Sequence, residues 1–143
     1  AWELFHYAEI AGAQAAQRRA RQYLARLMSL FNGSEGWFLE YNGADPGYQT
    51  RCLRYLVKIA ALTGDDALWS AAERAAQFVN QLMMPDHSLN PMLGCRSTAL
   101  LYPSAFEVLA ARSESGAGIA ARVREAWRLG RVPLPSEIIL RKL

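Results

Sequence analysis

The sequence has few of the residues on which specialised structures depend. It contains two histidines and two cysteines, and Cys52 and Cys95 match neither a CxxC pair nor a zinc-ligand spacing. Ten glycines and six prolines are too few for a collagen-like or low-complexity protein. No apolar run approaches the ~20 residues that span a bilayer. We therefore expect no metal and no membrane partner. We interpret both thiols as small buried groups, and the sequence leaves a disulfide between them undecided.

Enzyme motifs with a recognisable local pattern are also missing. The chain contains no GxSxG, P-loop, HExxH, GxGxxG or EF-hand sequence. Nucleotide-dependent enzymes, α/β-hydrolases and zinc proteases are therefore disfavoured. We expect no cofactor.

What the sequence does contain is the material of one folded core. Hydrophobic residues make up 52% of the 143 residues and charged residues 20%, which excludes a disordered chain. We expect residues 1–143 to form a single all-helical domain. No signal peptide is recognisable, so a cytoplasmic location is slightly favoured. The chain begins with Ala1 inside a helical pattern and stops in an apolar run, Ile138 to Leu143, so we expect a fragment of something longer.

The net charge of +3 is weakly basic, and its densest cluster is Arg18, Arg19, Arg21 and Arg26. Apolar residues recur at three- and four-residue steps through the same stretch, so the arginines occupy the remaining, solvated face of a helix. Stacking aromatic residues do not alternate with these arginines, so we expect no nucleic-acid partner. RNA binding through the cluster is the least favoured alternative and would be salt-sensitive.

The apolar period is helical almost throughout, and the order of segments predicts three helical hairpins. Two segments repeat by class at an offset of 55 residues, Gln22 to Met28 and Gln77 to Met83. Strand-like alternation occurs only near residues 37–41. The predicted helices lie within residues 2–31, with a turn near Gly12, and then at Tyr48–Leu62, Asp66–Met83, Pro103–Arg112 and Ala117–Leu129.

Turns within the hairpins are short, whereas the connections between hairpins are long. Thr63-Gly64-Asp65-Asp66 supplies a glycine to end one helix and an aspartate to cap the next. The helix at 48–62 is apolar on most sides, with Arg51, Arg54 and Lys58 in a narrow stripe, whereas the helix at 66–83 has one polar face. Each hairpin therefore pairs an inner helix with an outer one.

This alternation resembles the α/α toroid. The stretch from Gly47 to Leu68 is similar to a hairpin of six-hairpin glycosidases, heparinase-type polysaccharide lyases and uronyl epimerases, in which a Thr-Gly-Asp turn precedes an Ala-rich outer helix. The resemblance covers residues 14–130 and lies in the hairpin pattern, with no catalytic motif. It implies part of a barrel, completed by further hairpins or by a second copy of the chain. It also implies a substrate cleft at the N-terminal ends of the inner helices.

The first long loop and the helix after it, residues 33–51, carry sugar-type ligand groups. Aromatic rings stack on sugar faces, and carboxylates, amides and guanidinium groups bind hydroxyls and acids. Asp45 and Tyr48 are catalytic candidates, although Asp45 is also a natural helix cap before Pro46. The substrate-binding candidates here are Trp37, Glu40, Tyr41, Gln49 and Arg51, and the aromatic residues have loop packing as their alternative role.

The second loop, residues 85–104, adds His87 as a catalytic candidate, with Arg96 and Tyr102 as substrate-binding candidates. His87 could act as a general base, but it also fits a surface turn, Pro85-Asp86-His87-Ser88. Arg96 could pair with a substrate carboxylate or bind loop carbonyls.

The function expected from these features is a carbohydrate-active protein whose partner is a saccharide, uronic acids included, or another small polar ligand. Hydrolysis would need two carboxylates among Glu40, Asp45 and Asp86. A lyase or epimerase would need a base and groups that neutralise a carboxylate. The alternative is a non-catalytic helical-repeat module that binds protein through a concave face.

Overall fold

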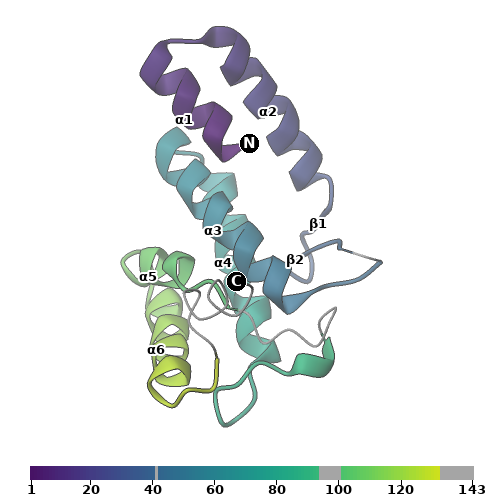
Figure 1. Cartoon of the computed structure of the whole chain (residues 1–143), viewed down its shortest axis with the longest axis vertical. Coiled ribbons are helices and arrows are strands. Elements are labelled where there is room, and N and C mark those ends of the chain that lie inside the picture. Colours follow the sequence, from purple (N-terminus) through teal and green to yellow (C-terminus); the bar gives the residue numbers. More distant parts are fainter. Residues whose placement is uncertain (41, 94–100, 133–143) are drawn as a thin grey trace, which may run out of the picture.

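The computed structural model describes residues 1–40, 42–93 and 101–132, and this part of the chain is mostly helical (Figure 1). One short antiparallel ribbon pairs Phe31 with Phe38 and Asn32 with Trp37. The all-α class predicted from the sequence is confirmed.

The elements are α1 Trp2–Ala11, α2 Gln14–Met28, β1 Phe31–Asn32, β2 Trp37–Phe38, α3 Pro46–Thr63, α4 Asp66–Leu82, the 3₁₀ turn Pro91–Leu93, α5 Ser104–Ala110 and α6 Glu114–Arg128.

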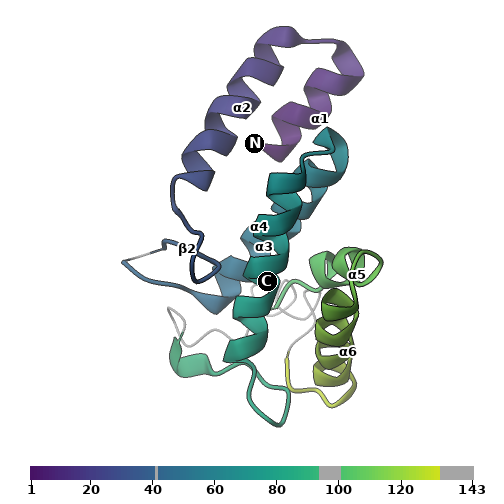
Figure 2. The ribbon, with the colours of Figure 1, turned by 180° about the vertical axis from the view of Figure 1, so that it is seen from behind.

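Each odd-numbered helix packs against the helix that follows it, which gives three hairpins. Successive hairpins also touch through like members: α1 contacts α3, α3 contacts α5, and α4 contacts α6. Figures 1 and 2 show α3 and α4 in the middle, with the α1–α2 hairpin beyond one end and the α5–α6 hairpin beside the other. The odd-numbered helices therefore form one layer, and α4 and α6 lie in the next.

Local capping chemistry sets where the helices begin. Asp45 accepts a hydrogen bond from the Tyr48 backbone N–H, so α3 begins at Pro46, two residues before the predicted start. Asp65 caps α4 in the same way after Gly64 (φ 67°), as predicted. Ser113 accepts from Gly116 N–H, so α6 begins at Glu114 and not at Ala117, because the polar run expected to be a turn is the first turn of the helix.

The core lies among α3, α4, α5 and α6. Leu53, Leu56 and Ile59 of α3 are fully buried, and Phe106 of α5 and Val123 of α6 meet them in one cluster. In α2, by contrast, only Ala20 is buried. The first hairpin is therefore attached to the core mainly through α1. No helix in the described residues is long and apolar enough to cross a membrane.

Arg122 on α6 closes the C-terminal end of α4. Its guanidinium donates to the backbone and side-chain oxygens of Asn80 and to the carbonyls of Met83 and Met84, at 2.6–3.3 Å. Because this group is partly buried, we expect Arg122→Met to lower the free energy of unfolding by about 2 kcal/mol. Arg124→Met is the matched control, since Arg124 pairs with Glu107 on the exposed surface and should change stability little. Urea denaturation measures both. Equal losses in the free energy of unfolding would show that the hydrogen bonds of Arg122 do not stabilise the C-terminal end of α4.

Candidate functional site

Both long connections are fastened to the first two turns of α3, through neighbouring residues. The Gln49 amide donates to the Phe38 carbonyl at 2.7 Å and accepts from the Phe38 backbone N–H at 2.9 Å. The Thr50 hydroxyl accepts from the Tyr102 backbone N–H at 3.0 Å. The N-terminal end of α3 is therefore where the ends of the two loops meet.

Two predicted site residues at this end of α3, Gln49 and Asp45, use their polar side-chain atoms within the protein. Gln49 is fully buried, and both ends of its amide are bonded to Phe38. Gln49 is thus inaccessible to a substrate, and we assign it to holding the first loop. Asp45 is 3% exposed and caps α3, which is the alternative role expected from the sequence. Neither residue offers a free group to a ligand.

Glu40 and Arg51 each lie close enough to Cys52 to influence its thiol. The pKa of the Cys52 thiol is raised to about 11, first by its burial and then by the Glu40 carboxylate, while Arg51 acts in the opposite direction. Cys52 is a free, half-buried thiol. Glu40 of the first loop is thereby located beside Cys52 on α3.

The raised pKa keeps Cys52 protonated and unreactive. Relative to a thiol with a pKa of 9.0, a pKa of about 11 reduces the thiolate fraction at pH 8 roughly 100-fold, because the difference is two units. We expect slow iodoacetamide labelling in a Cys95→Ser variant, where Cys52 is the only cysteine. Glu40→Gln should accelerate labelling by removing a negative charge, whereas Glu35→Gln should not. Equal rates in both variants would contradict the placement of Glu40.

A stripe of aromatic and basic side chains continues along α3 from this end. Tyr48, Arg51, Tyr55 and Lys58 follow three- and four-residue steps, which put them on one face of the helix. Arg51 is exposed and the other three are half-buried. At the far end of the stripe the Lys58 ammonium lies 5.1 Å from the ring centre of Trp2 on α1.

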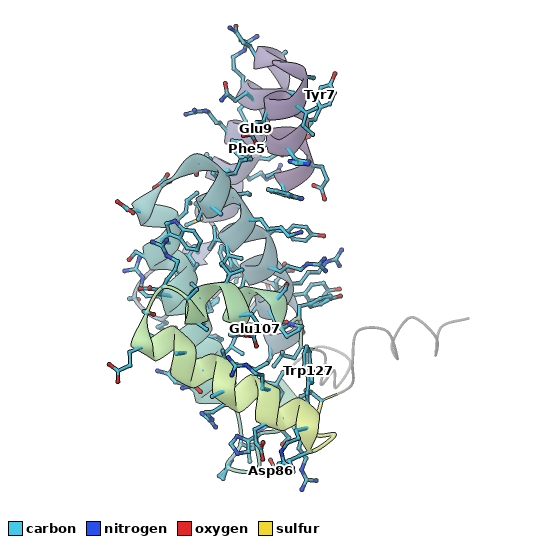
Figure 3. The ribbon with its side chains drawn as sticks, turned by 90° about the vertical axis from the view of Figure 1, so that its left-hand side faces the viewer. Phe5, Tyr7, Glu9, Asp86, Glu107 and Trp127 are labelled. Atoms are coloured by element: carbon cyan, nitrogen blue, oxygen red, sulfur yellow. The ribbon has the colours of Figure 1, made fainter. Side chains whose placement is uncertain are left out.

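On α1 the Trp2 ring also stacks on the ring of His6, with the two ring centres 5.1 Å apart. His6 is exposed. Figure 3 shows side chains of α1 and α3 projecting from one side of the molecule, on which the labelled Tyr7 and Trp127 also lie. We call Trp2, Tyr48, Arg51, Tyr55 and Lys58 the basic-aromatic stripe. Of these five residues, only Tyr48 and Arg51 were predicted from the sequence as site residues. Lys58 was placed on the polar side of this helix but was not predicted to bind a ligand.

His87 lies elsewhere, in a turn next to α6. Its backbone N–H donates to the Met84 carbonyl, and its φ is 67°. The imidazole lies close to Glu125 of α6, whose pKa is lowered first by the hydrogen bond from Arg128 and to a smaller extent by His87. Figure 3 labels the neighbouring Asp86 at the end of the molecule opposite Tyr7. The Asp86 carboxylate lies 3.8 Å from the Arg131 guanidinium. His87 therefore occupies the turn that was its alternative role, beside Glu125 of α6.

The remaining predicted residues divide between the loops and the undescribed segments. Trp37 is half-buried and its indole N–H donates to Glu35, inside a turn that Asn32 organises. Tyr102 is half-buried beside α3. Tyr41 and Arg96 lie outside the described residues. Among the residues described, no group of three or more histidines, cysteines or carboxylates is arranged to hold a metal.

No known protein family, curated protein or solved structure matches this chain. Its function is therefore argued from its own residues.

Proposed function

We propose that this chain is part of an α/α toroid, with α1, α3 and α5 as inner helices. The order of contacts supports this arrangement, because each odd-numbered helix touches the next odd-numbered one and α4 touches α6. A closed barrel would continue the same contacts with further hairpins or a second copy. The free face of the odd-numbered layer would then line the interior.

On that face, we propose, the protein binds an acidic saccharide. The observation that carries the proposal is the basic-aromatic stripe, in which Arg51 and Lys58 alternate with Tyr48 and Tyr55 on one side of α3. Rings pack against the apolar faces of sugars, and a guanidinium pairs with a carboxylate through two parallel hydrogen bonds. Arg51 and Lys58 are separated by two turns of helix, roughly 10 Å, which is comparable to the length of a disaccharide.

The proposed activity is binding, because two of the three residues considered for catalysis have structural roles. Asp45 caps a helix, and His87 belongs to a turn beside α6. Glu40 remains as a carboxylate beside the stripe. It fits a role in orienting sugar hydroxyls, which need fixed polar partners.

Calorimetric titration with trigalacturonate tests this proposal. We expect saturable binding, weakened about tenfold by Arg51→Gln and by Lys58→Gln, because each removes one charge-assisted contact to a carboxylate. Arg18→Gln on the exposed outer face of α2 is the matched control and should leave the affinity unchanged. Maltotriose, which has no carboxylates, should bind at least tenfold more weakly. Equal affinities for the two sugars, or equal losses in all three variants, would contradict the proposal.

A protein-binding helical module is the second candidate, and exposed apolar residues on α1 favour it. Tyr7 is 57% and Ile10 is 73% exposed, and they lie one turn apart. This alternative expects no response to any saccharide. It also expects association with a protein that is lost in a Tyr7→Ser, Ile10→Ser double variant and retained in Arg51→Gln.

A further inference from the structure

A cavity lies at the opposite end of α3 from the loops. A half-open cavity of about 390 Å³ is enclosed by α1, α2 and the last residues of α3. Its apolar wall includes Phe5, Ala8 and Leu62, and its polar wall includes Glu9, Gln17 and Arg21. A smaller cavity of about 170 Å³ shares Phe5 and Arg21 with it. The volume of the larger one falls within the range of small-molecule sites.

The residue spacing explains why the cavity has these walls. Phe5, Ala8 and Glu9 lie at three- and four-residue steps on one side of α1, and Figure 3 shows Phe5 and Glu9 on the other side of that helix from Tyr7. Gln17 and Arg21 lie on one side of α2 in the same way. Ala20 is the only buried residue of α2, so the inner side of α2 packs loosely against the rest of the protein and lines the cavity.

The two sides of the cavity carry opposite charge. Glu9 stands in the last turn of α1, where the free carbonyls already give partial negative charge, and that turn has no basic residue. α2 begins beside it without a side-chain cap, so the unpaired N–H groups of its first turn give partial positive charge. Arg21 adds a full positive charge on the α2 side. Neither the Glu9 carboxylate nor the Arg21 guanidinium makes a hydrogen bond or ion pair with any described residue.

We infer that this cavity binds an α-amino acid with a large apolar side chain. The ammonium group pairs with Glu9 and the C-terminal end of α1, and the carboxylate pairs with the Arg21 guanidinium. The side chain packs against Phe5, Ala8 and Leu62. Opposed charges over an apolar wall match a zwitterion better than a simple carboxylic acid, which Glu9 would repel. This site is separate from the saccharide site, so either can fail without the other.

The test is an NMR titration of the ¹⁵N-labelled full chain with L-phenylalanine. We expect saturable shifts confined to the residues around Glu9, Gln17, Arg21 and Leu62. N-acetyl-L-phenylalanine lacks the ammonium group and L-phenylalaninamide lacks the carboxylate, so each should bind about tenfold more weakly. Shifts elsewhere, no saturable shifts, or equal affinity for all three compounds would overturn the inference.

Charge variants on exposed positions extend the test without endangering the fold. Glu9→Gln and Arg21→Gln should each weaken L-phenylalanine binding about tenfold. Glu9→Gln should also raise the melting temperature slightly, because it removes a carboxylate from a helix C-terminus. Glu3→Gln and Arg18→Gln are the controls on the same two helices, and neither residue lines the cavity. Equal losses in variants and controls would overturn the assignment of Glu9 and Arg21.

Discussion

Replacing Gln49 by leucine is expected to lower the free energy of unfolding by about 2–4 kcal/mol. The leucine side chain fills a similar volume but pairs with neither the N–H nor the C=O of Phe38, both of which Gln49 now satisfies in a buried setting. An unpaired buried backbone group costs about 1–3 kcal/mol, and this substitution leaves two. Urea denaturation followed by circular dichroism measures the change.

Gln77→Leu is the matched control, because Gln77 is an exposed residue of α4 and its substitution should change stability by less than about 0.5 kcal/mol. A Gln49→Leu protein as stable as the control would show that the hydrogen bonds of Gln49 do not hold the first loop at α3.

The second large effect is expected at Gly116, where α6 passes the end of α5. A Cβ atom at this position would lie 2.3 Å from the Leu109 carbonyl oxygen and 2.6 Å from its carbon, which are backbone atoms with little freedom to move. Gly116→Ala should therefore force the two helices apart and cost about 2 kcal/mol or more. The measurement is again the free energy of unfolding in urea.

Gly118 gives a control two residues further along the same helix. A Cβ atom there meets nothing within 4 Å, and the residue is exposed. Gly118→Ala should therefore stabilise the protein by about 0.5–1 kcal/mol, since alanine favours the helix over glycine. Two substitutions of the same kind are thus expected to change stability in opposite directions. Effects of the same sign would contradict the close packing of α5 on α6.

The hairpins could be predicted because their signals are local. Thr63-Gly64-Asp65 ends one helix with a left-handed glycine and caps the next, and the structure uses it in this way. Residues 113–116 fall between two predicted helices, but the Ser113 hydroxyl caps α6, which begins at Glu114. The polar composition of Ser113 to Gly116 fits either role, and the packing of Gly116 on Leu109 favours the helix.

The candidate site was less predictable, because it depends on contacts between distant residues. Gln49 carries an amide of the kind that binds sugar hydroxyls. Only its hydrogen bonds to the Phe38 backbone reveal that it holds the first loop. Placing Glu40 beside Cys52 required the path of the loop, which the sequence does not give. The cavity at Glu9 and Arg21 was missed, although the steps Phe5-Ala8-Glu9 and Gln17-Arg21 are visible in the sequence. The reason is that hydrophobic periodicity predicts which side of a helix faces its neighbours, but it does not predict whether a cavity remains between them.

An NMR titration of the ¹⁵N-labelled chain with trigalacturonate tests whether the basic-aromatic stripe on α3 binds an acidic saccharide, because it locates the ligand without assuming a reaction. We expect saturable shifts in the backbone amides of Tyr48, Arg51, Tyr55 and Lys58, which disappear in an Arg51→Gln, Lys58→Gln double variant. Shifts confined to the arginines of α2, or no saturable shifts at all, would contradict it.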